Sequence, residues 1–341
     1  MKALVYFDVN RLVGFEGARV RKSIKGALEL SNVTHTEALL DSFDIAHFIS
    51  PDDEIKIYYP IERNKPIIVS ALYSENDKNA SYLEYKEKLN GQLKVTLKPK
   101  ALRFLNNANL VLVPTNTCRD MLVNYGVTSE IRTVEPGVNL SRFNFSREDE
   151  MEIFNRYYRR NPERKMVVGF GDRIKNINDL ACFVKIAKAF PDIDFYFISS
   201  AIDERKLRAN AMWFGVKCPK NCTTVNLLSD DVYRSALLNA SMVIFPGYNI
   251  VGAVSIADAM ASKSQILTRK NVLIDGIEAN KELLYVAETD AEMIDIVRKY
   301  FSNEIQPTID TAYEFISKHT LDKYGEQLIE IYNEQISLKN K

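Results

Sequence analysis

Short apolar runs alternate with longer amphipathic stretches along most of the chain, and the alternation occurs in two successive series. Such alternation is typical of βαβ units, which form mostly parallel sheets covered by helices. In the first series the predicted strands are Ala3–Phe7, Ile45–Ile49, Pro66–Val69, Leu110–Val113 and Ile131–Val134. In the second series they are Lys165–Gly169, Phe195–Ile198, Thr223–Asn226, Met242–Phe245 and Gln265–Leu267. The pattern predicts an α/β protein with two Rossmann-like domains whose parallel sheets face a central cleft.

Helices are predicted between the strands, over Arg19–Leu30, Thr117–Tyr125, Ile177–Ala189, Asp203–Phe214, Ser229–Asn239 and Ala253–Ser262. The charged stretch Phe145–Pro162 has no strand rhythm and is expected to be a linker that contains a helix. A chain of 341 residues exceeds the size at which a single core usually stops growing. We therefore expect a first domain over residues 1–150, a second over 151–320 and a C-terminal helix within 321–341.

The overall charge and the apolar runs narrow the class of protein. Lysine and arginine number 45, as do aspartate and glutamate, so the net charge is zero; a nucleic-acid binder normally carries a basic excess. The apolar N-terminal run ends at Asp8, too early for a signal peptide, and no run is long enough to span a bilayer. We expect a cytoplasmic protein. Cys218 and Cys222 lack a nearby second Cys or His pair, so no metal site is expected.

The segment Phe245–Ala261 runs from a predicted strand through a glycine-containing loop into a helix. Ligands of tandem parallel-sheet domains bind where the carboxyl ends of the strands meet. Backbone N–H groups near Gly252, Ala253 and Val254 would seat a pyrophosphate there, and Asp258 could accept hydrogen bonds from ribose hydroxyls. An ordinary strand, loop and helix with small residues for close packing explains the pattern equally well.

The segment Val167–Asn176 carries the glycines Gly169 and Gly171, followed by Arg173 and Lys175. Cations at this position could neutralise a diphosphate leaving group as its charge develops. The pattern lacks the third glycine of the Rossmann fingerprint. A structural glycine pair is therefore the alternative interpretation.

In their order along the chain, these pieces resemble family-4 retaining glycosyltransferases of the GT-B fold, and the resemblance covers nearly the whole sequence. The matching segments are Pro136-Gly137-Val138-Asn139 with Phe143, Val168-Gly169 with Lys175, Val232-Tyr-Arg-Ser-Ala-Leu237, and Asp258-Ala-Met-Ala261. In the first half, Tyr6-Phe7, Phe43-Asp-Ile-Ala-His47 and Val113-Pro-Thr115 resemble the branch that makes diglycosyl-diacylglycerol in Gram-positive bacteria.

The resemblance implies transfer of a hexose, with retention, from a nucleotide diphosphate sugar, with a UDP-hexose favoured, to an acceptor such as a glycolipid or a cell-envelope glycan. No bound cofactor or metal is implied. The implied donor-binding residues are Gly171, Arg173, Lys175, Asn249, Gly252, Ala253, Val254 and Asp258. Arg19 and His47 are assigned to the acceptor side, and His47, near the carboxyl end of a predicted strand, is expected to face the crevice.

Three positions depart from the family pattern. The first Glu of the family's Glu-x7-Glu pair falls on Ile250, the Arg of its basic pair falls on Ile174, and a His after the third strand aligns near Ser70 or Leu72. Each lost charge-assisted hydrogen bond is worth roughly 1.5–3 kcal/mol, and the three together correspond to a reaction slower by about 10³- to 10⁶-fold. A non-catalytic GT-B subunit that stabilises or targets an active glycosyltransferase is therefore the second hypothesis. A sugar-nucleotide epimerase is the third, although the acid/base carboxylates that it needs are not evident.

The stretch Lys86–Arg103 carries six basic residues and one acidic residue, Glu87, interleaved with apolar residues. A stretch of this kind can rest on an anionic membrane surface. The alternative is a solvated helix face whose other side lies in the core, with Pro99 interrupting any continuous helix.

Overall fold

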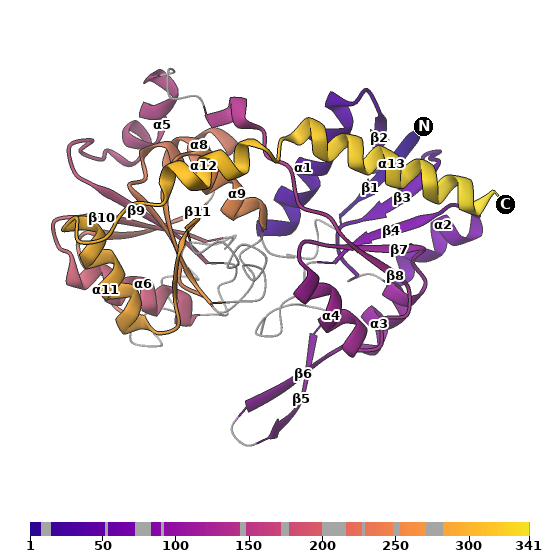
Figure 1. Cartoon of the computed structure of the whole chain (residues 1–341), viewed down its shortest axis with the longest axis horizontal. Helices are drawn as coiled ribbons and strands as arrows, with labels where there is room; N and C mark the ends of the chain where they lie inside the picture. Colours follow the sequence, from indigo (N-terminus) through magenta and orange to yellow (C-terminus); the bar gives the residue numbers. More distant parts are fainter. Residues whose placement is uncertain are drawn as a thin grey trace.

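The computed structural model describes residues 1–7, 15–51, 54–71, 83–89, 92–143, 148–171, 177–199, 216–226, 229–247, 253–270 and 282–340. Two six-stranded parallel sheets form two α/β domains, which Figure 1 shows side by side. The two-domain α/β architecture predicted from the alternating pattern is confirmed.

The first sheet has the strand order β2-β1-β3-β4-β7-β8. Its strands are β1 (Lys2–Tyr6), β2 (Thr34–Thr36), β3 (Ile45–Phe48), β4 (Ile67–Ser70), β7 (Leu110–Val113) and β8 (Glu130–Thr133). The helices of this domain are α1 (Phe15–Leu30), α2 (Tyr58–Glu62), α3 (Pro99–Asn106) and α4 (Asn116–Asn124), with short 3-10 turns at Glu54–Ile57 and Leu140–Phe143. All five strands predicted for the first half occur, each within a residue or two of its predicted limits.

The second sheet has the order β11-β10-β9-β12-β13-β14. Its strands are β9 (Met166–Gly171), β10 (Asp194–Ser199), β11 (Cys222–Asn226), β12 (Met242–Phe245), β13 (Gln265–Arg269) and β14 (Tyr285–Ala287). The helices that follow the first domain are α5 (Glu148–Tyr158), α6 (Ile177–Ala189), α8 (Asp230–Asn239), α9 (Ala253–Ala261), α11 (Asp290–Phe301), α12 (Ile309–Ser317) and α13 (Leu321–Lys339). The strands predicted for the second half are confirmed, whereas the predicted helix Asp203–Phe214 lies outside the described residues.

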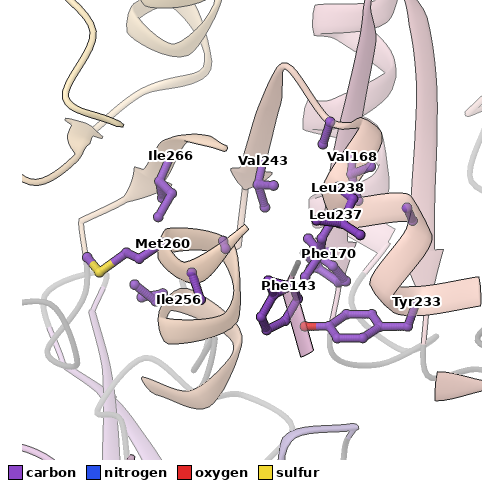
Figure 2. Packing of buried hydrophobic residues seen from close by; sticks show 14 of the residues in the cluster. Phe143, Val168, Phe170, Tyr233, Leu237, Leu238, Val243, Ile256, Met260 and Ile266 are labelled. Carbon is purple, nitrogen blue, oxygen red and sulfur yellow. The ribbon is translucent and has the colours of Figure 1, made fainter. Parts of the chain in front are cut away.

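The central strands of each sheet, such as β3, β4, β7 and β12, are buried on both faces, which explains why they are nearly continuous apolar runs. In the second domain one face carries Val168 and Val243 against Leu237, Met260 and their neighbours, as Figure 2 shows. The opposite face packs against α6 and α11. Removing this apolar surface from water is the main contribution that holds each domain together.

The last helix, α13, returns to the first domain, and Figure 1 shows it in yellow lying along that domain. Leu321, Tyr324 and Leu328 are buried in the same cluster as residues of α1 and β1. The helices approach so closely that a Cβ at Gly325 would lie 2.6 Å from the carbonyl oxygen of Ala27. The C-terminal segment therefore contributes to the core of the domain that the N-terminal segment begins. The domain limits at residues 150 and 320 stay predictions.

The helical interpretation of the basic stretch is wrong over its first part. Residues Leu83–Leu89 and Gln92–Leu97 form an antiparallel hairpin, β5–β6, which extends away from the rest of the domain in Figure 1. Apolar residues at every second position, as in Leu93-Lys-Val-Thr-Leu97, favour a strand over a helix. The helix α3 begins only at Pro99, where proline suits a first turn. Among the helices that the structure describes, none is both long enough and apolar enough to cross a membrane.

Candidate functional site

The strand order indicates where each domain binds a ligand. The order of the second sheet reverses between β9 and β12, and that of the first sheet reverses between β1 and β3. In open parallel sheets, ligands bind at the carboxyl ends of the strands beside such a reversal. Helix α1 follows β1, helix α9 follows β12, and the two helices contact each other. The carboxyl edges of the two sheets therefore meet where the domains meet.

Several predicted donor residues belong to the segments that follow β9 and β12 in sequence. Arg173, Lys175, Asn249 and Gly252 lie outside the described residues. Their assignment to the donor site stays a prediction.

Gly169 and Gly171 lie in β9, close to aromatic rings. A Cβ at Gly169 would lie 2.3 Å from the ring of Phe183, and a Cβ at Gly171 would lie 2.3 Å from the ring of Phe197. Contacts this short do not occur in close-packed interiors, so packing alone requires glycine at both positions. The glycine pair needs no ligand to explain it, and a donor contact of Gly171 stays a prediction.

Helix α9 begins at Ala253, and its first N–H groups have no partners within the helix, as at any helix start. Such a start favours an anion. The side chain of Val254 is 7% exposed and belongs to the apolar cluster that contains Val20 and Leu321. Any donor contact of Val254 must therefore come from its main chain.

Asp258, on the second turn of α9, is 4% exposed. The hydroxyl of Tyr233 donates to its Oδ2 at 3.0 Å, and Figure 2 shows the Tyr233 ring extending from α8 toward α9. Nη2 of Arg19 lies 3.4 Å from the same oxygen. Burial raises the pKa of Asp258, and the positive charges of Arg19 and Arg142 reduce that rise.

Arg19, predicted for the acceptor side, reaches out of α1 into the second domain. Its guanidinium donates to the hydroxyls of Ser255 and Tyr233. Its Cζ lies 4.2 Å from the centroid of the Tyr233 ring and 5.9 Å from that of Phe170, at which distance a cation is attracted to the ring face. Arg19 is 9% exposed and contacts the carboxylate that the family resemblance assigns to the ribose.

A second group of charges lies beside this cluster, at the outer part of the domain seam. Lys22, one turn after Arg19, and Arg142 both contact the carboxylate of Asp230 on α8. Arg19, Lys22, Arg142, Asp230 and Asp258 line a cavity of about 580 Å³. Its volume is within the range of small-molecule sites.

His47 does not face the cleft, so the expectation made for it is corrected. Its side chain is completely buried in β3. Its Nδ1 lies 2.7 Å from the hydroxyl of Tyr332, on α13, and its Nε2 lies 2.8 Å from Oγ of Ser70. Burial lowers its pKa to about 3, so the ring is neutral. The strand register turns this residue toward α13, whose position the sequence of β3 does not reveal.

Two residues of the cluster, Tyr233 and Ser255, are absent from the residues predicted for the site. Tyr233 is separated from Arg19 by 214 positions and Ser255 by 236. No local pattern reports a contact over such a separation. Among the described residues, no group of three His, Cys, Asp or Glu side chains is arranged to hold a metal ion.

No protein-family model matches the chain. It is similar to the processive diacylglycerol alpha-glucosyltransferase of Acholeplasma laidlawii, with 22% identity over 99% of this chain and 100% of the relative. Among solved structures it is similar to HepE of Anabaena in complex with UDP and glucose, with a TM-score of 0.73, 11% identity and coverage of 98% of this chain and 99% of HepE. It is also similar to a glycosyltransferase of Rickettsia africae, with a TM-score of 0.68, 12% identity and coverage of 100% and 99%. The chain has the GT-B fold of these structures.

Proposed function

We propose that the chain is a glycosyltransferase that moves a hexose, with retention, from a UDP-hexose to an acceptor. The observation that carries the proposal is the meeting of the two carboxyl sheet edges at α1 and α9, with Asp258 on α9 at the junction. A bilobed site of this kind accepts a nucleotide on one domain and an acceptor on the other. HepE, of the same fold, binds UDP and glucose, which supports the choice of donor.

In this proposal the diphosphate lies at the start of α9, on the N–H groups of Gly252, Ala253 and Val254. Lys175 and Arg173 neutralise its charge, Gly171 and Asn249 line the donor pocket, and Asp258 accepts hydrogen bonds from the ribose. Developing charge on the leaving group is the largest effect for a site to stabilise in such a transfer. Arg19 lies between this pocket and the first domain, where the acceptor is expected.

We propose a glycolipid acceptor at the inner face of an anionic membrane. The relative from Acholeplasma laidlawii is named for a diacylglycerol substrate. The hairpin β5–β6 and the start of α3 contain the basic stretch Lys86–Arg103, and lysines near an anionic surface contribute about 1 kcal/mol each.

Release of UDP tests the enzymatic proposal. The purified chain is incubated with UDP-glucose, UDP-galactose or UDP-N-acetylglucosamine and with vesicles that contain monoglucosyl-diacylglycerol, and UDP is measured. We expect release with at least one donor and a rate about 10- to 100-fold lower for Lys175→Met, since one charge-assisted hydrogen bond is lost. Binding of no nucleotide in calorimetry would contradict the proposal.

Vesicle sedimentation tests the membrane contact. Changing Lys86, Lys88 and Lys94 to Gln should weaken binding to phosphatidylglycerol vesicles by about 100-fold. The matched control changes Lys188, Lys217 and Lys220, which are exposed on the second domain, to Gln. Equal effects of both triple variants would contradict a specific contact by the hairpin.

A second candidate is a non-catalytic subunit that stabilises or targets an active glycosyltransferase. Ile250 and Ile174 in place of donor-binding side chains favour it, as does the engagement of Asp258 by Arg19. Affinity purification of the chain from its own cells tests it, because recovery of no companion glycosyltransferase would exclude a stable complex.

A further inference from the structure

One side chain of the first domain is inserted into a socket of the second. Arg19 leaves α1 and meets Ser255 and Asp258 on α9, Tyr233 on α8 and the ring of Phe170 in β9. All four partners belong to the second domain. The guanidinium of Arg19 is therefore one of the links between the domains, beside the apolar contact of Val254 with the cluster of Val20 and Leu321.

The insertion has an electrostatic consequence for Asp258. A carboxylate that is 4% exposed bears a desolvation penalty of several kcal/mol unless a cation lies beside it. Arg19 supplies that cation at 3.4 Å. Ionised Asp258 is thus tolerated in this arrangement of the domains because Arg19 is present.

Arg19 contacts Ser255, Tyr233 and Asp258 through their side chains. A ligand with hydroxyl groups can take over contacts of this kind without disturbing any main-chain ladder. The cavity of about 580 Å³ is lined by both Arg19 and Asp258, so the pair borders open space.

We propose that Arg19 is an autoinhibitory latch: it occupies Asp258 in the free protein and ties the domains together, and a nucleoside-diphosphate sugar displaces it from Asp258 through the ribose hydroxyls. The second half of this inference rests on the proposed function, whereas the tie between the domains does not.

Lys22 provides a matched comparison, because it also bridges α1 and α8. Its ammonium lies 2.7 Å from Asp230, but its side chain is 56% exposed and that of Asp230 is 41% exposed. Exposed pairs contribute little because water screens them. Loss of Lys22 should leave the domains together, whereas loss of Arg19 should not.

The tie is tested without any ligand by measuring the distance between nitroxide labels at Val123→Cys, on α4, and Ala291→Cys, on α11, both exposed positions. The background carries Cys218→Ser, because the other native cysteines are buried. We expect a narrow distance distribution for the labelled protein that keeps Arg19 and for Lys22→Met, and a broader one for Arg19→Met. Asp258→Asn, which keeps the side-chain volume, should broaden it similarly, and the double variant no further. If Arg19→Met and Asp258→Asn give the same distance distribution as the labelled protein that keeps both residues, the proposal is overturned.

Competition is tested by calorimetry with UDP-glucose. Removing the competing guanidinium in Arg19→Met should tighten binding about tenfold or more, whereas Lys188→Met, at an exposed position of the second domain, should stay within about twofold. Equal or weaker binding by Arg19→Met would overturn the competition. If the wild type binds no nucleotide while the labels of Arg19→Met separate, the proposed function fails and the tie between the domains stands.

Discussion

Arg19 and Arg269 are both buried and both face an aspartate, but they do so in different surroundings. Arg269, at the end of β13, is 1% exposed and pairs with Asp290 at 2.5 Å. Its Nε donates to the carbonyl of Pro246 and its Nη1 to that of Glu288. Arg19 crosses between domains, and its contacts with Ser255, Tyr233 and Asp258 are to side chains.

The pKa values of the two aspartates, Asp290 and Asp258, are shifted in opposite directions. Burial alone would raise the pKa of Asp290, but hydrogen bonds from Lys185, Arg269 and Cys182 outweigh it and lower the pKa to about 2. For Asp258 burial dominates, and the pKa is raised. A buried pair held by main-chain carbonyls within one domain is part of the fold, whereas a pair held by side chains across a seam can be exchanged. Arg269 is therefore a structural residue, and Arg19 is suited to regulation.

Replacing Arg269 tests its structural role and should give the largest loss of stability among the variants. Arg269→Met removes the buried cation beside Asp290 and a donor to the carbonyls of Pro246 and Glu288, so the free energy of unfolding should fall by about 3–5 kcal/mol. Urea unfolding followed by circular dichroism measures it. Lys185→Met is the control: the Lys185 side chain is 60% exposed, so loss of this second partner of Asp290 should cost no more than about 0.5 kcal/mol. A loss below about 1 kcal/mol for Arg269→Met would contradict the structural role.

As the pH falls, the buried imidazole of His47 lowers the stability of the fold in a different pH range from the ion pair of Asp290. Since the pKa of His47 in the folded state is about 3, below its ordinary value, the unfolded chain takes up a proton first as the pH falls. Stability is therefore full above about pH 6.5 and is lost progressively down to about pH 3, with a loss of about 2 kcal/mol between pH 7 and pH 5.

Asp290 does not contribute to this loss, because the stability from its lowered pKa is present above its ordinary pKa and disappears only as the pH falls through about 2. His47→Gln, which can still hydrogen-bond Tyr332 and Ser70, should flatten the profile between pH 7 and pH 5. An unchanged profile in that variant would assign the loss to other groups.

Replacing Arg19 should have the smallest effect on stability. Arg19→Met removes charge-assisted hydrogen bonds, but Asp258, with its raised pKa, can then take up a proton, which limits the loss to about 1–2 kcal/mol. Thermal unfolding of the variant beside Arg269→Met measures the difference. A loss as large as that of Arg269→Met would show that the two arginines play the same structural role.

Periodicity predicted the fold well because it depends on local order. Every predicted strand that opens or closes a βαβ unit occurs, from Ala3–Phe7 to Gln265–Leu267, since burial on both faces imposes apolar runs. The helical interpretation of the stretch containing Leu93–Leu97 was wrong, because it followed the basic residues, whereas the apolar residues alternate with the period of a strand.

The site was predictable only in part. Asp258 could be identified because its helix resembles a known motif, and Arg19 could be identified as a site residue. That the two side chains meet could not be predicted, because 239 positions separate them and the contact depends on how the domains pack. The assignment of His47 to the cleft was wrong because the sequence of β3 does not reveal that α13 packs beside this residue.

The most direct measurement is a crystal structure of the chain with UDP-glucose. We expect the nucleotide at the start of α9, a ribose hydroxyl within hydrogen-bond distance of Asp258, and Arg19 farther from that carboxylate than the 3.4 Å of the free protein. A nucleotide bound elsewhere, with Arg19 still on Asp258, would contradict it.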